Sequence, residues 1–219
     1  MSAAPLPVIV RDLREFYSSE FGVFYIDPRD AGIKLLRNLV RMGATAAVQE
    51  VGRQTELPVE RLAGVLPNLD GVSMSLGSMI LLSDAAVADP REEIDTVTHE
   101  VQHSIDTAET GLPKAGIDYL FGELRAHREA RANVAGRFAR MLVTGDTFTA
   151  KDVLNDLRSP IYHGLTAREL EFAEDVVNDN LLSIENLVCP PITAAKAALK
   201  FLQTRHRDAI VFDAWRSAP

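Results

Sequence analysis

Residues 96–106 read TVTHEVQHSID and place the pattern His-Glu-x-x-His within a segment of helical periodicity. Polar residues fill most of the segment, and apolar residues recur at the spacing of the buried face of an amphipathic helix. The pattern predicts a helix that carries His99 and His103 at the border of its buried face. The apolar face consists of Ile94, Val97, Val101, Ile105 and Ala108.

The two histidines are four residues apart, so on a helix they lie one above the other on the same face. Both imidazoles can then reach one metal ion. Glu100 lies about 100° around the helix from His99, where its carboxylate can take a proton from a water that the ion holds. Because the motif has this chemistry when it lies on a helix, the spacing predicts a metal centre with Glu100 as the general base.

The ends of this helix are marked in the sequence. Asp89 can cap its N-terminus, Pro90 suits the first helical position, and Glu92 completes a capping box. Gly111 marks its exit. These signals predict a helix that begins at about residue 90 and ends near residue 110.

Further elements are predicted from local pattern. Strands are expected at residues 21–25 and 72–84, the second with a bulge at Gly77, while the first twenty residues read as irregular. The remaining predicted helices span about 115–142, ended by Gly145, and about 193–205, with two more that begin at the capping residues Thr149 and Thr166.

A catalytic zinc needs three protein ligands, so a third must lie downstream of the histidines. Glu123 follows His103 by twenty residues on the second long helix, which can fold back to face the first. Over about residues 72–130 the chain resembles the gluzincin metallopeptidases, which pair His-Glu-x-x-His with a glutamate on the next helix. The resemblance implies Zn²⁺ on His99, His103 and Glu123, with Glu100 as base. Where those proteins place an aspartate four residues after the glutamate, this chain has His127.

Two other third ligands remain open. Glu129 lies in a pattern similar to that of phage and mobile-element peptidases that cleave repressors, and it points about 240° away from Glu123, so both cannot hold the same ion. Glu109 occupies the position of the third metzincin ligand, although this chain has Asp106 where those proteins have a glycine. We take Glu123 as the preferred ligand because a facing helix suits a tetrahedral site.

The predicted function is zinc-dependent hydrolysis of peptide bonds in a protein or peptide substrate. The strand at residues 79–82 is expected to be the sheet edge that pairs with an extended peptide. A donor for the oxyanion is also needed, and His163 is the chosen candidate because a glycine follows it in its loop. The other candidates are Tyr119, His127, Tyr162 and His206.

Two alternatives belong to other classes. The first is a non-catalytic zincin-like binding or structural module. The second is a helical DNA-binding regulator built on residues 44–65, which resemble a helix-turn-helix weakly. A formal charge of −8 disfavours nucleic-acid binding, since that binding depends on Lys and Arg contacts to phosphates. The arginines at positions 125–140 are expected to form a solvated helix face.

The predicted fold is α+β and predominantly helical. A zincin-like core of a small sheet with an edge strand, the motif helix and the glutamate helix is expected within residues 1–145. Residues 146–219 are expected to add a helical subdomain to this single domain of residues 1–219. Cys189 is the only cysteine and excludes an internal disulfide.

The expected location is the cytoplasm, because the N-terminus lacks a basic signal region and no apolar run is long enough for a membrane helix. A phage or mobile-element origin would place the chain in the host cytoplasm or the virion. The sequence predicts no membrane partner, and it makes no prediction of the oligomeric state.

Overall fold

The computed structural model describes residues 3–28, 73–111, 122–159 and 165–218. These residues form seven α-helices and one small three-stranded sheet, so the predicted α+β, predominantly helical class is confirmed. The expected helical pair at residues 44–65 lies outside the described residues, as does His163. None of the described helices is long and apolar enough to cross a bilayer.

The sheet has the order β1-β3-β2, so β3 is its central strand. Strand β1 (Phe24–Ile26) pairs parallel with β3 (Met79–Leu81), and β2 (Met74–Leu76) pairs antiparallel with it. Our expectation of an edge strand at residues 79–82 is therefore wrong. Within the described part of the chain, β2 is the edge beside the motif helix.

A second difference from the predicted strands is a hairpin in place of one bulged strand, and a glycine explains it. Residues 72–84 do not form one bulged strand, because Gly77 adopts a left-handed conformation (φ 62°) and reverses the chain. The result is the tight β2–β3 hairpin, a turn for which glycine is favoured because it lacks a Cβ.

The motif helix α5 (Pro90–Thr110) has the predicted limits. The Asp89 side chain accepts a hydrogen bond from the Arg91 backbone N–H at 2.9 Å, which confirms the cap. Glu92 does not complete the predicted capping box. Its carboxylate instead accepts a hydrogen bond from Arg140 at 2.7 Å, because a guanidinium on the neighbouring helix offers a charged partner.

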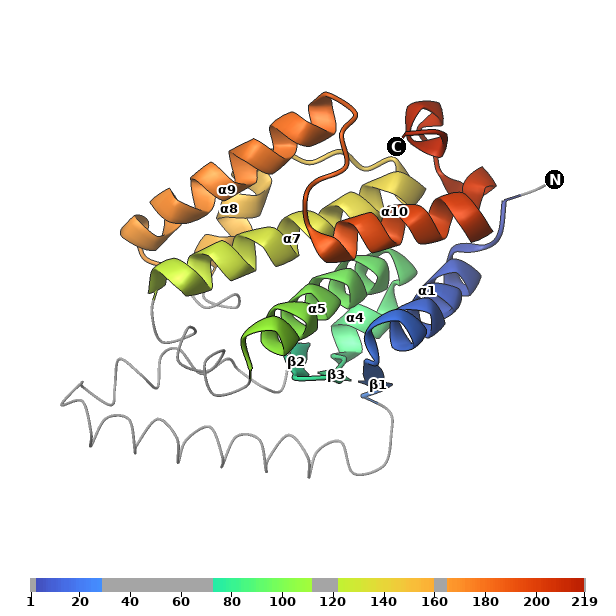
Figure 1. Ribbon diagram of the computed structural model, residues 1–219, viewed down its shortest axis with the longest axis horizontal. Coiled ribbons are helices and arrows are strands. Elements are labelled where there is room, and N and C mark those ends of the chain that lie inside the picture. The colour runs from blue at the N-terminus through green and yellow to red at the C-terminus, as the bar shows by residue number, and fades with distance from the viewer. Residues whose placement is uncertain (1–2, 29–72, 112–121, 160–164, 219) are drawn as a thin grey trace.

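Two helices that the sequence analysis did not predict flank α5. Helix α1 (Leu6–Phe21) begins after Pro5 and buries four residues at helical spacing, and α4 (Asp84–Ala88) is a single turn capped by Ser83. Figure 1 shows α1, α4 and α5 side by side above the sheet. The buried residues of α1 are Ile9, Val10, Leu13 and Tyr17.

Helix α7 (Gly122–Thr144) packs along α5. The pairs that join the two helices run in opposite sequence order, from Glu92 with Arg140 to His103 with Glu129, so the helices are antiparallel. The predicted fold-back of the second long helix is therefore confirmed. Gly145 ends α7 in a left-handed conformation (φ 80°), as predicted.

Helices α8 (Ala150–Arg158), α9 (Ala167–Glu185) and α10 (Thr193–Arg205) complete the bundle, followed by short 3₁₀ turns at Arg207–Ala209 and Asp213–Arg216. Thr149 and Thr166 each cap a helix through a reciprocal capping box, which confirms both predictions. Helix α9 lies on α7, and α10 contacts both α5 and α7. One hydrophobic cluster joins these helices to the rest.

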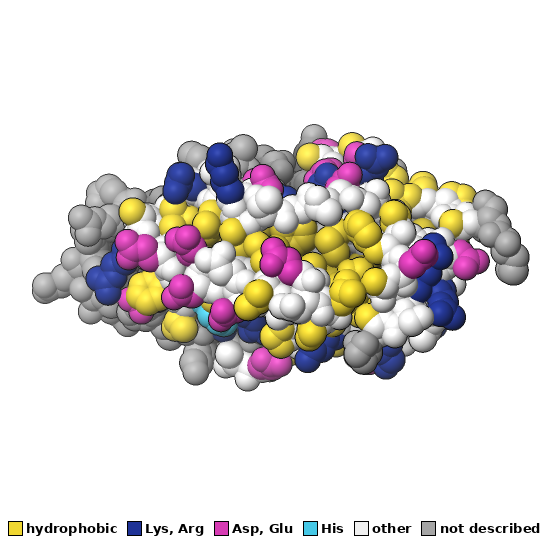
Figure 2. Space-filling view, turned by 90° about the horizontal axis from the view of Figure 1, so that it is seen from above, with side chains coloured by type: hydrophobic (Ala, Val, Ile, Leu, Met, Phe, Trp, Pro, Cys, Tyr) yellow, Lys and Arg dark blue, Asp and Glu magenta, His cyan; other side chains and the backbone are white. Residues whose placement is uncertain are grey.

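The arginines of α7 connect helices, contrary to the expectation of a solvated face. Arg125 is buried against Glu169 of α9 at 2.6 Å, Arg137 pairs with Asp156 of α8, and Arg140 reaches α5. On the face seen in Figure 2, hydrophobic side chains occupy the middle, and Lys and Arg lie mostly around its rim. Among the described side chains, no continuous stripe of Lys and Arg crosses this face.

Candidate metal centre

Three side chains from α5 and α7 converge on one point. His99 and His103 project from successive turns of α5, and their Nε2 atoms are 3.0 Å apart. The Glu129 carboxylate of α7 closes a triangle, with its Oε2 atom 3.6 Å from His99 Nε2 and 3.5 Å from His103 Nε2. Glu129 is 1% exposed, and His103 is buried as well.

This triangle has the dimensions of one face of a tetrahedral zinc site. Zn²⁺ binds imidazole nitrogen and carboxylate oxygen at about 2.0–2.2 Å, so two of its ligand atoms lie about 3.3–3.5 Å apart. The centre of the circle through the three ligand atoms lies about 2.0 Å from each of them, so a metal ion at or just above this centre is at bonding distance from all three. The donor set of two imidazoles and one carboxylate is also one that zinc accepts. The residues therefore fit this metal.

Glu129 takes the place that we assigned to Glu123. Glu123 lies at the start of α7, with a side chain 55% exposed, and pairs with Arg168 of α9 at 3.1 Å. Six residues separate the two glutamates, which turns Glu123 about 240° around the helix and moves it about 9 Å along the axis. The arrangement thus favours Glu129, one of the two alternatives, as the third ligand.

Glu109 is not part of the triangle either. It is exposed near the C-terminal end of α5, where it lines a cavity of about 250 Å³ together with Asp106 and residues of α7. His127 lines the same cavity. Burial, with help from Arg131, lowers the pKa of His127 below its ordinary value.

Glu100 lies beside the triangle and against the sheet. It is 5% exposed, and the backbone and hydroxyl of Ser75 hydrogen-bond its carboxylate. Burial raises the pKa of Glu100 to about 7, although His103 lowers it in part. A carboxylate with a pKa near neutrality can both accept and return a proton at physiological pH.

The charge of Glu129 also acts on His103. Burial alone would lower the pKa of His103, but the surrounding carboxylates, Glu129 foremost and then Glu100 and Asp106, together outweigh it and raise the pKa to about 9. Without a metal, a proton therefore occupies the centre near pH 7. A divalent cation would take over the role of this positive charge between the same three side chains.

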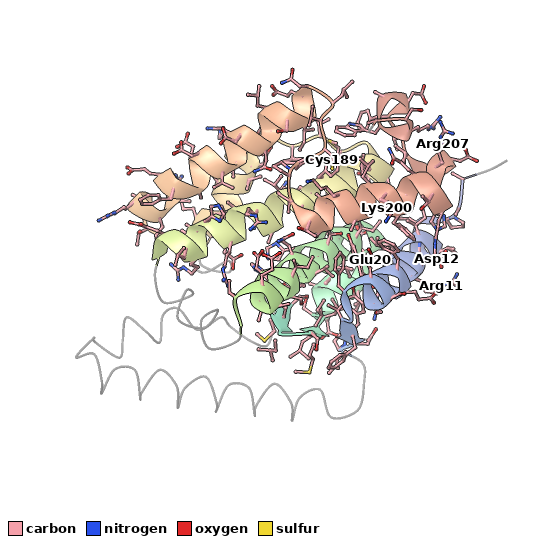
Figure 3. All side chains as sticks on the ribbon, in the orientation of Figure 1. Arg11, Asp12, Glu20, Cys189, Lys200 and Arg207 are labelled. Carbon is pink, nitrogen blue, oxygen red and sulfur yellow. The ribbon has the colours of Figure 1, made fainter. Side chains whose placement is uncertain are left out.

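The candidates for an oxyanion donor are not brought to the triangle among the described residues. His163, Tyr119 and Tyr162 lie outside those residues. His206 is placed at the C-terminal end of α10, where its Nε2 atom lies 3.0 Å from Asp12 of α1. Figure 3 labels Asp12 on α1 near that end of α10.

Ser75 is a contact of the site that the sequence analysis did not predict. It lies at the centre of β2, opposite Ile80 of β3. A prediction of this contact requires a hairpin at residues 72–84, because the turn at Gly77 determines which residues lie next to α5. The hairpin brings the edge strand and the proposed base together.

Comparison with known proteins gives no further assignment. No protein family model matches the chain, and neither the curated proteins nor the solved structures include a significant match.

Proposed function

We propose that the protein hydrolyses peptide bonds with a zinc ion held by His99, His103 and Glu129. The observation that carries this proposal is the triangle of two Nε2 atoms and one carboxylate oxygen, with sides of 3.0–3.6 Å, beside the buried Glu100. The resemblance of the sequence to the gluzincin metallopeptidases over about residues 72–130 supports the same reading.

A bound zinc ion would supply a Lewis acid that polarises a carbonyl group and acidifies water. The chain's own residues supply the proton transfers. Glu100 accepts the proton of the attacking water and later donates it to the leaving amine, for which its raised pKa is suited. Ser75 holds the Glu100 carboxylate in place during both transfers.

The edge strand β2 offers a surface for an extended peptide. Within the described residues, β2 pairs with β3 on one side only. Ser75 of β2 hydrogen-bonds the Glu100 carboxylate, which places the proposed base beside this strand. A peptide that adds a strand to this edge uses main-chain hydrogen bonds, and these recognise any extended sequence. We therefore expect an unfolded or extended protein segment as the substrate.

The test begins with zinc content. Purified protein should hold close to one zinc per chain and should cleave an unfolded protein such as casein. Glu100→Gln should retain the zinc and lose cleavage by a factor of about 10²–10⁴, since general acid–base catalysis contributes about that much. The matched control is Glu92→Gln, a carboxylate on the same helix that pairs with Arg140.

Three outcomes would overturn the proposal. A chain that binds no zinc would exclude it. A zinc-bound chain in which Glu100→Gln cleaves as well as the parent would remove the assigned base. Zinc binding without any cleavage of extended substrates would favour the non-catalytic module instead.

A further inference from the structure

A row of buried polar side chains runs along α5 beside the two histidines. Thr98, Gln102 and Asp106 recur every four residues, so they share one face of the helix. Their exposures are 0%, 0% and 4%. Buried polar groups destabilise a fold unless they are hydrogen-bonded, so the partners of this row are informative.

The row connects α5 to α1 and α10. The Tyr17 hydroxyl of α1 lies 3.2 Å from both the Thr98 hydroxyl and the Ala194 carbonyl oxygen. The Ala194 backbone N–H, in the first turn of α10, donates to Gln102 Oε1 at 3.0 Å. Gln102 Nε2 in turn donates to Asp106 Oδ1 at 2.7 Å. Three helices are thus joined in a polar chain that ends at Asp106.

Asp106 extends the chain to the helix that carries Glu129. Arg131 Nη1 of α7 donates to Asp106 Oδ1 at 3.3 Å. Asp106 follows His103 by three residues, and Arg131 follows Glu129 by two, so this ion pair lies within about one helical turn of the triangle. It joins the same two helices that must be aligned for His103 and Glu129 to meet.

We propose that Asp106 is a positioning residue for the metal centre. Through Arg131 it holds α7 in the register that places Glu129 against the histidines, and through Gln102 it links that register to the N-terminus of α10. A slip of one residue would move Glu129 by about 1.5 Å and turn it about 100°. A metal site tolerates far less than that. The inference rests on the proposed metal centre.

Both contacts of Asp106 are made by one oxygen atom. Gln102 Nε2 and Arg131 Nη1 donate to the same Asp106 Oδ1 atom, at 2.7 Å and 3.3 Å. A shift of α7 along α5 would therefore break the contact with Arg131, while the bond to Gln102, which lies within α5, would remain.

The test measures the affinity of the full chain for Zn²⁺ alone, by competition with a chromophoric chelator. Asp106→Asn keeps the shape of the side chain, and Arg131→Met keeps the aliphatic stem but removes the guanidinium. We expect each variant to bind Zn²⁺ about 10-fold more weakly than the parent, as is typical when a residue that orients metal ligands is lost. The double variant should be no weaker than the weaker single variant, because both changes break one contact.

Arg140→Met is the matched control. Arg140 also joins α7 to α5, through Glu92 at 2.7 Å, but at the far end of the helix pair. It should lower the thermal stability of the metal-free chain without a change in Zn²⁺ affinity. If Asp106→Asn does not fold, Arg131→Met still decides the question, because the Arg131 side chain is 25% exposed and tolerates replacement.

Folded Arg131→Met and Asp106→Asn proteins that bind Zn²⁺ as tightly as the parent would overturn the inference and leave the proposed function intact. Additive losses in the double variant would also overturn it, because the two side chains would then act separately. A parent chain that does not bind Zn²⁺ would exclude the proposed function and, with it, this role of Asp106.

Discussion

Glu129 Oε2 of α7 lies 3.5 Å from His103 Nε2 of α5, across the interface of two antiparallel helices. The contact joins residues that are 26 positions apart in the sequence. The alignment of α5 and α7 therefore determines whether the centre exists.

Replacement of the two glutamates of α7 should have opposite results. Glu129→Gln should reduce the zinc content to well below one per chain, because a neutral amide replaces the only carboxylate of the triangle. Glu123→Gln should leave the zinc content unchanged, since Glu123 pairs with Arg168. Metal analysis of the two purified variants checks this. Zinc loss in Glu123→Gln alone would restore our first assignment.

Zinc should stabilise the chain more strongly as the pH rises. The surrounding carboxylates, Glu129 foremost, raise the pKa of His103 to about 9 in the metal-free chain, so a proton competes with the metal below that pH. The difference in melting temperature between zinc-loaded and chelator-treated protein should therefore increase from pH 6 to pH 8. A difference that shrinks over this range would contradict the assignment of His103 as a ligand.

The metal-free chain should lose stability between about pH 4 and pH 7 through Asp95. Burial raises the pKa of Asp95 from its ordinary value to about 7, more than Arg137 lowers it. The folded state then holds a proton that the unfolded state releases, so the free energy of unfolding falls as the pH rises through this range. We expect a loss of roughly 2 kcal/mol, because the side chain retains some contact with solvent.

Asp95→Asn provides the comparison. The neutral amide cannot ionise, so the variant should be more stable than the parent at pH 8 and close to it at pH 4. Chemical unfolding in the presence of a chelator at both pH values measures the difference. Parallel pH profiles for the two proteins would show that Asp95 ionises without penalty.

Gly136→Ala should destabilise the fold although alanine favours helices. A Cβ at Gly136 would lie 2.5 Å from the backbone oxygen of Asp95 and closer still to its side chain. Overpacking of this kind costs about 1–3 kcal/mol, which exceeds the helix-propensity gain of about 0.5–1 kcal/mol. The free energy of unfolding checks this. The Asp95→Ala background should not rescue the variant, because the backbone contact remains.

The sequence pattern predicted the helices whose ends are marked by capping residues, prolines or glycines. The limits of α5 and α10 and the caps at Thr149 and Thr166 follow from prolines, glycines and hydroxyl side chains that act within one turn. Helix α1 was not predicted, because the first twenty residues carry two prolines near their start, although proline is compatible with the first turn of a helix. The hairpin was missed because Gly77 suits both a bulge and a turn.

The third ligand was harder to predict because spacing alone does not determine which face of α7 meets α5. Gly136 is the residue that indicates which face of α7 meets α5. A glycine within a helix permits close approach of a neighbouring helix, and here it meets Asp95. Glu129 precedes Gly136 by seven residues and so shares its face, whereas Glu123 lies about 220° away. The contact of Gly136 with α5 therefore selects Glu129, but that contact becomes visible only in the folded chain.

The hydrogen bond from the Ala194 amide to Gln102 has a practical consequence for protein engineering. A shortened chain that stops at residue 145 would remove the donor to Gln102 Oε1 and expose the apolar side chains of α5 and α7 that α10 covers. We expect such a fragment to aggregate before its zinc content could be measured. A shortened version of this protein must therefore retain α10.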